Sequence, residues 1–233
     1  RATALALQER GYTVDELSRR AEGMPDIRHI VADITKEETL QAAVEQVLAV
    51  EGRLDLVVNN AGFGISGAIE FTDTQEAQRL FDTLFFGMVR MNRCVIPLMR
   101  QQGRGRIVNI SSVAAPVPIP FQAYYSAGKA AINAYTMALA NELRPFGVTV
   151  CAVMPGDIKT GFTAARHKII DGDDIYQGRI GRSVQRMEHD EQTGMDPAKV
   201  GRYIAAVASR EGSHHPLYAT RIDYKFFVFL TKV

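Results

Sequence analysis

Three residues in the middle of the chain could carry out acid-base chemistry on a carbonyl group. Tyr125 and Lys129 form a Tyr-x-x-x-Lys motif, and Ser112 ends an Ile-Ser-Ser sequence after an apolar run. Tyrosine has a reference pKa of about 10, so it is a poor acid at neutral pH unless a neighbour stabilises its anion. A lysine ammonium about 4 Å away stabilises the tyrosine anion by about 4 kcal/mol at an effective dielectric near 20. Residues with this spacing share one face of a helix, so the motif predicts such a pair, and the serine hydroxyl could hold the carbonyl oxygen.

The elements that position these residues follow from the hydrophobic pattern. Apolar runs rich in β-branched residues alternate with longer helical patterns, which predicts βαβ units and a parallel sheet. Strands are expected over residues 28–33, 54–59, 105–111 and 147–153, with a weaker one over 12–18. Helices are expected from a capping box at Thr35–Glu38 to Gly52, over about 75–102, from about 124 to Arg144, and after Asp196-Pro197. The predicted fold class is therefore α/β, a doubly wound, Rossmann-type parallel sheet with helices on both faces, in a single domain.

Polar residues stand where several of these strands end. Asp33 ends one strand, Asn59-Asn60-Ala61-Gly62 ends the next, Ser111-Ser112 follows the third, and Pro155-Gly156 follows the fourth. Ligands of open α/β sheets bind at the carboxyl ends of the strands. The sequence therefore predicts one site that these four segments build together.

With these motifs in this order, nearly the whole chain resembles the single-domain branch of the short-chain dehydrogenase/reductase family. The resemblance implies that Tyr125 is the general acid or base, that Lys129 lowers its pKa and binds the nicotinamide ribose, and that Ser112 holds the substrate oxygen. It also implies a nucleotide site in which Asp33 meets the adenine and two groups of residues line the remaining cofactor. Those groups are Asn59, Ala61 and Gly62 beside the adenosine ribose, and Pro155, Gly156, Ile158 and Thr160 around the nicotinamide.

The choice between the two nicotinamide cofactors depends on charge after the second strand. NADP requires a cation near its 2′-phosphate, whereas NAD is usually marked by an acidic residue there. The weaker strand is followed by Ser18-Arg19-Arg20, and Arg1 adds a further positive charge. The sequence therefore favours NADP(H). The alternative is NAD(H), in which case Arg19 and Arg20 would be ordinary surface charges.

Two features differ from the family pattern. The glycine-rich phosphate turn and the first strand are missing from the sequence, which begins at Arg1 in what resembles the helix after that turn. In addition, Leu84 stands where the family usually has an asparagine that helps a water to relay protons near the lysine. We therefore expect reduced but real reductase activity, and we expect Leu84→Asn to increase the rate.

Composition sets limits on partners and location. The chain has 27 basic and 26 acidic residues, which gives no electrostatic reason to expect nucleic acid as a partner. No apolar stretch approaches the roughly 20 residues of a membrane span. Two cysteines in apolar surroundings favour a reduced, cytoplasmic setting. No ligand set accompanies His214-His215, so no metal is expected. Small-residue and apolar stripes on the long helix after residue 124 fit a core or subunit interface, and the family resemblance implies a homodimer or homotetramer.

The resulting interpretation is an NADP(H)-dependent oxidoreductase that interconverts a carbonyl and an alcohol. Residues 161–195 lack clear periodicity and are expected to form a mobile substrate loop with at most a short helix. This loop and the 224–230 tail look most like hydroxysteroid- or retinol-dehydrogenase-like members, which suggests an apolar substrate. A 3-oxoacyl thioester reductase and a non-catalytic, NADP-binding regulatory module remain as alternatives.

Overall fold

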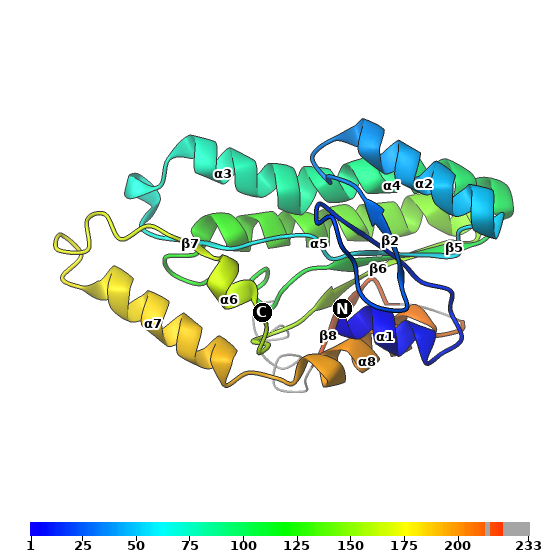
Figure 1. The fold of residues 1–233 in the computed structure, drawn as a ribbon. Helices are drawn as coiled ribbons and strands as arrows, with labels where there is room; N and C mark the ends of the chain where they lie inside the picture. The colour runs from blue at the N-terminus through cyan, green and yellow to red at the C-terminus, as the bar shows by residue number, and fades with distance from the viewer. Residues whose placement is uncertain (213–214, 221–233) are drawn as a thin grey trace.

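A parallel sheet with helices on both faces forms the body of the protein, as a computed structural model shows for residues 1–212 and 215–220 (Figure 1). The strands are β1 (Asp15–Ser18), β2 (Arg28–Val31), β3 (Leu56–Asn59), β4 (Ile65–Ser66), β5 (Gly105–Ile110), β6 (Val148–Met154), β7 (His167–Lys168) and β8 (Leu217–Ala219). The helices are α1 (Ala2–Gln8), α2 (Glu37–Glu51), α3 (Thr74–Phe81), α4 (Gly87–Gln102), α5 (Ala123–Leu143), α6 (Phe162–Ala165), α7 (Arg179–Gln192) and α8 (Pro197–Ala208). A π-helical turn at Asp82–Phe86 joins α3 to α4, and short 3₁₀ helices cover Ile69–Phe71 and Arg144–Phe146.

The main sheet is parallel and has the strand order β3-β5-β6-β8. Its register pairs Asn59 with Asn109 and Met154 with Ala219, so the carboxyl ends of these strands lie along one edge. β1 and β2 form a separate parallel pair, as do β4 and β7, and β1 is not paired with β3. The predicted α/β architecture is confirmed, and each of the five expected strands is present.

Apolar side chains fill both faces of this sheet. One cluster packs α2, α4 and α5 against β5 and β6, with Leu40, Val95, Met99, Ile107 and Leu139 at its centre. The other packs α1 and α8 on the opposite face, where Figure 1 shows these two helices together. A Cβ atom at Gly201 would lie 2.6 Å from the carbonyl carbon of Ala2, so α1 and α8 approach this closely because residue 201 is glycine.

Two of the helix-end predictions are confirmed and one is wrong. Asp196 caps α8 by accepting a hydrogen bond from the Ala198 N–H at 2.9 Å, and Gly52 ends α2 in the left-handed conformation with φ 69°. The capping box at Thr35 does not form, because the N-cap of α2 is Lys36 and has no side-chain cap. The Thr35 hydroxyl instead donates to the Asp33 carboxylate at 2.8 Å, and this contact holds the chain at the end of β2.

Residues 161–195 contain more regular structure than the sequence suggested. They form α6, β7 and the 14-residue helix α7, whereas at most a short helix was expected. Ile180, Val184 and Met187 are buried on one face of α7 at helical spacing. The many charged residues between them hide this stripe in the sequence.

No helix in the described part of the chain combines the length and apolarity that crossing a membrane requires. The 224–230 tail, on which the likeness to hydroxysteroid and retinol dehydrogenases partly rested, lies outside the described residues, as does His214.

Candidate active site

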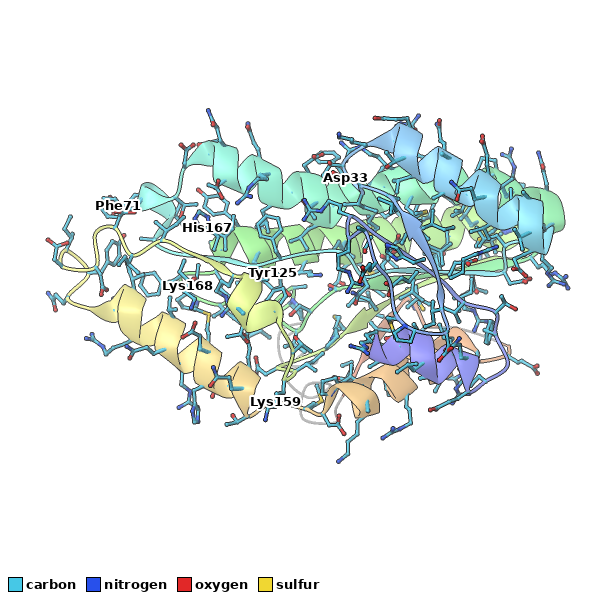
Figure 2. The ribbon with its side chains drawn as sticks, viewed as in Figure 1. Asp33, Phe71, Tyr125, Lys159, His167 and Lys168 are labelled. Atoms are coloured by element: carbon cyan, nitrogen blue, oxygen red, sulfur yellow. The ribbon has the colours of Figure 1, made fainter. Side chains whose placement is uncertain are left out.

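The structure brings Ser112, Tyr125 and Lys129 together at the carboxyl edge of the main sheet. Ser112 follows β5, while Tyr125 and Lys129 lie one turn apart near the start of α5. Tyr125 is hydrogen-bonded to Ser112, and the Lys129 ammonium lies 5.6 Å from the centre of the tyrosine ring. The same ammonium donates to the Ile110 carbonyl at 2.7 Å. Figure 2 shows Tyr125 beside α6, so that helix lies next to the reactive hydroxyl.

Burial sets the protonation of this pair. Desolvation raises the pKa of Tyr125 to about 12, and the hydrogen bond with Ser112 offsets only part of that rise. Burial also lowers the pKa of Lys129 to about 8. The expected lowering of the tyrosine pKa by lysine is not seen, because desolvation dominates the shift and Lys129, with a pKa of about 8, has already lost its charge at the pH where Tyr125 titrates. Tyr125 therefore keeps its proton at neutral pH, as an acid must, and Lys129 is the group that titrates first.

This difference predicts a pH dependence for carbonyl reduction. We expect kcat/KM to fall by about tenfold per pH unit above about pH 8, because Lys129 then loses the charge that stabilises the tyrosinate left after proton donation. Below that pH both groups hold their protons, so the rate should level off. Steady-state reduction between pH 6 and 10 measures the profile. Lys129→Met should be slow at every pH and lack this decline; a decline at the same pH in Lys129→Met would assign it to another group.

Leu84 lies in the π-helical turn and is buried, with 2% of its surface exposed, among Ile65, Leu80 and Ile169. Its methyl groups fill the space between two glycines: a Cβ at Gly62 would lie 2.4 Å from Leu84, and one at Gly128 would lie 3.4 Å from it. The contact at Gly62 is too short for a side chain there, whereas the contact at Gly128 is an ordinary van der Waals distance. The apolar side chain offers no hydrogen bond at the position where the family has an amide.

A second group of predicted residues gathers at the ends of β1 and β2. Arg1 and Arg19 are exposed, and the Arg19 charge helps to lower the pKa of Asp33, after the larger effect of hydrogen bonds from Thr35. Asp33 receives both Thr35 bonds on Oδ1, and Oδ2 has no donor among the described residues. Ser18 accepts hydrogen bonds from the Arg20 backbone and guanidinium. This end of the edge presents positive charge and one carboxylate oxygen that receives no hydrogen bond from the described residues.

The Asn59 segment divides into two parts. The Asn59 amide donates to Asn92 at 2.8 Å and to Asn109 at 2.9 Å, so it joins β3 to α4 and β5 inside the protein. Ala61 and Gly62 are exposed just beyond it and present a small-residue surface at the sheet edge. Such a surface fits the predicted wall beside a ribose. The hydrogen bonds of Asn59 anchor the end of β3, from which this segment continues.

Two of the predicted cofactor residues after β6, Ile158 and Thr160, make contacts with other parts of the protein. Ile158 forms a parallel bridge with Met195 and packs against the cluster around α1 and α8. The Thr160 hydroxyl accepts from the Phe162 N–H at 3.2 Å, one residue before Gly161, the N-cap of α6. Pro155 and Gly156 lie between β6 and these contacts, and the Pro155 carbonyl accepts from the Val113 N–H at 3.0 Å. This bond holds the loop after β6 next to the loop that carries Ser112.

A buried ionic group beside Tyr125 was not among the predicted site residues. The Phe162 ring lies 5.7 Å from the Tyr125 ring, and the guanidinium of Arg166 lies 5.7 Å from the Phe162 ring. Arg166 forms an ion pair with Glu191, which also accepts from the Thr163 hydroxyl at 2.6 Å. Glu191 continues the buried stripe of α7, and that periodicity is the signal that could have revealed it.

Comparisons with known proteins agree with this geometry. A family model described as short chain dehydrogenase matches residues 2–169. The chain belongs to the short-chain dehydrogenase family. As a member of it, the protein is an NAD(P)-dependent oxidoreductase. A 3-ketodihydrosphingosine reductase of Bacteroides thetaiotaomicron is 39% identical over 223 residues, which cover 94% of this chain and 82% of that protein.

Solved structures of this short-chain dehydrogenase family share the fold. The crystal structure of a short-chain dehydrogenase from Streptomyces avermitilis superposes with a TM-score of 0.87 at 32% identity, covering 98% of this chain and 86% of the other. Two more distant structures also have this fold: ElxO with NADP, at 23% identity, and NAD⁺-bound xylitol dehydrogenase, at 24%. Their TM-scores are both 0.79, and they cover 97% and 94% of this chain and 93% and 91% of their own. The fold thus accommodates either nucleotide.

Proposed function

We propose that this short-chain dehydrogenase reduces a ketone to an alcohol with NADPH. The observation that carries the proposal is the array in which Tyr125 is hydrogen-bonded to Ser112 and lies under the Lys129 ammonium. Bound NADPH would supply the hydride for the carbonyl carbon. Tyr125 donates its proton to the carbonyl oxygen, the Ser112 hydroxyl donates a hydrogen bond to the same oxygen, and Lys129 stabilises the resulting tyrosinate.

The surroundings of Tyr125 favour a substrate with a large apolar part. Ile65, Leu84 and Ile169 pack in one cluster with Tyr125, and Phe162 covers the tyrosine from α6. Burying alkyl surface against such side chains is favourable by about 25 cal/mol per Å². The Bacteroides relative is named for a ketone of dihydrosphingosine, and a ketone on a long alkyl chain is the class that we propose here.

A carbonyl panel tests this function. NADPH oxidation would be measured with long-chain ketones, small ketones, steroids, retinals and 3-oxoacyl thioesters, using the full-length protein. The proposal expects the highest kcat/KM for long-chain ketones. Preference for the thioesters would instead support a 3-oxoacyl thioester reductase. Binding of NADPH without turnover of any carbonyl would support a regulatory module and contradict the proposed activity.

The cofactor preference should depend on Arg19. Its exposed guanidinium has no ion-pair partner among the described residues, so it is available to a 2′-phosphate. We expect Arg19→Ala to weaken NADPH binding by about tenfold, as loss of a charge-assisted hydrogen bond does, and to leave NADH binding unchanged. Fluorescence titration with both nucleotides measures the two affinities.

Arg20 provides a matched control for this test. Its guanidinium pairs with Glu16 at 2.8 Å and also donates to Ser18, so less of its charge is available to a ligand. Arg20→Ala should therefore change the NADPH affinity by less than Arg19→Ala. Equal losses for NADPH and NADH in the Arg19 variant would count against NADP preference.

Leu84→Asn should raise turnover and lower stability together. The amide would supply a hydrogen-bonding group where Leu84 has none, while a polar group at this buried position costs about 1–3 kcal/mol of unfolding free energy. Stopped-flow reduction and urea unfolding measure the two effects. Leu84→Ala opens space without adding an amide and should destabilise without a faster rate; a rate gain in both variants would mean that space alone limits turnover.

We also propose that the enzyme forms a homodimer or homotetramer through the side of the molecule formed by α3, the π-helical turn and α5. A mostly apolar hollow of about 590 Å³ lies there, and half of the Phe86 surface is exposed beside it. Its lining includes Ala77, Phe81, Phe86, Tyr124 and Ala127. Light scattering should find an oligomer, and Phe86→Glu should shift it toward the monomer.

A further inference from the structure

Arg166 is a buried guanidinium with unused hydrogen-bond donors. The residue is 5% exposed and its side chain not at all, yet Nε and Nη1 have no hydrogen-bond partner among the described residues. Only Nη2 is paired, with Oε1 of Glu191. Buried polar groups normally find partners, and a guanidinium without them is costly. A group that is kept in this state is a candidate for binding a ligand.

The unpaired donors of Arg166 lie near Tyr125, the residue that carries the reacting hydroxyl. The centre of the Phe162 ring lies 5.7 Å from the Arg166 guanidinium and 5.7 Å from the centre of the Tyr125 ring, and the charge of Arg166 acts to lower the pKa of Tyr125. Gly64 is itself buried against this pair: a Cβ there would lie 3.4 Å from Arg166 Nε and 3.1 Å from the Phe162 ring, so both groups pack closely on the backbone of residue 64. Arg166 therefore borders the region where the substrate carbonyl must reach Tyr125.

The charges around Arg166 favour a neutral partner over an anion. Glu191 already neutralises the guanidinium. Burial raises the pKa of nearby Asp157, and the charges of Asp190 and Glu191 raise it further, so carboxylates crowd this side of the site. A carboxylate or phosphate on the substrate would add to that repulsion, whereas a hydroxyl or carbonyl oxygen accepts from Nε and Nη1 without it.

We propose that Arg166 is a specificity-determining residue that donates hydrogen bonds to a second, neutral oxygen of the substrate, near the reacting carbonyl. The preferred substrates are then long-chain hydroxyketones or diketones. Glu191 is the positioning residue that holds the guanidinium in place. The inference rests on the proposed ketone reduction and names its substrate class.

Matched substrate pairs test this assignment. Long-chain ketones with a hydroxyl one or two carbons from the carbonyl would be compared with ketones of the same length that lack it. We expect at least a tenfold higher kcat/KM for the better hydroxyketone, because a site built to bind a hydroxyl discriminates strongly against its absence. The double variant Arg166→Met/Glu191→Gln removes both buried charges. In this variant the ratio of kcat/KM for the hydroxyketone to that for the matched ketone should fall to about one. An unchanged ratio in the double variant, or a preference for 2-oxo acids over hydroxyketones, would overturn the proposal.

A binding measurement separates this inference from the proposed reaction. Calorimetric titration would compare the long-chain diol products with the corresponding monoalcohols in both proteins. Tighter diol binding that disappears in the double variant supports the role of Arg166, even if no ketone is turned over. Equal affinity for diol and monoalcohol in the unmodified protein contradicts it, even if simple ketones are reduced rapidly.

Discussion

Replacing Tyr125 with phenylalanine should lower the rate of ketone reduction by about 10²- to 10⁴-fold, the range that a general acid contributes. The variant keeps the ring that packs against Phe162 and under Lys129, and it loses only the hydroxyl hydrogen-bonded to Ser112. The fold and nucleotide binding should therefore remain. Single-turnover reduction and a nucleotide titration on the same preparation measure both properties.

Tyr124 is the natural control, because it precedes Tyr125 in α5 and packs in the same apolar cluster. Its hydroxyl is directed elsewhere, donating to the Ile69 carbonyl at 3.4 Å. Tyr124→Phe should stay within about threefold of the original rate, since loss of one partly exposed hydrogen bond costs about 1 kcal/mol or less. Turnover in Tyr125→Phe as fast as in Tyr124→Phe would exclude the tyrosine as the proton donor.

The parallel sheet could be predicted because its signals are local. The β-branched runs that became β3, β5 and β6 are short, apolar and followed by polar or small residues. Parallel strands end at one edge, so the endings of β5 and β6 were enough to place Ser112 and Pro155-Gly156 side by side. The helix α7 was missed for the opposite reason: its buried stripe stands among charged residues that lower its mean hydropathy.

The electrostatics of the site could not be predicted in the same way. From spacing alone, Lys129 was expected to lower the pKa of Tyr125, but burial depends on α6 lying against the ring, which only tertiary structure fixes. The same holds for Arg166 and Glu191, which are 25 residues apart in sequence and meet through the packing of α6 on α7. Thr160 and Ile158 show a further limit, because their contacts within the protein compete with the cofactor roles that the family resemblance implied.

The Arg166–Glu191 pair should produce the largest stability effect when only one partner is changed. Arg166→Met is expected to lower the free energy of unfolding by about 3–5 kcal/mol, because Glu191 would remain buried with the Thr163 hydroxyl as its main partner. Arg166→Met/Glu191→Gln should recover most of that loss, since glutamine can still accept from Thr163 and carries no charge. Urea unfolding of the two variants and the original protein measures the difference.

The ion pair between Arg186 and Asp190 calibrates this measurement on the same helix. Its N–O distance is 2.8 Å, but 76% of the Arg186 side chain is exposed, so solvent already stabilises both charges. Arg186→Met should therefore cost less than about 1 kcal/mol. If Arg166→Met cost no more free energy of unfolding than Arg186→Met, the prediction that Glu191 needs Arg166 as its buried partner would be wrong.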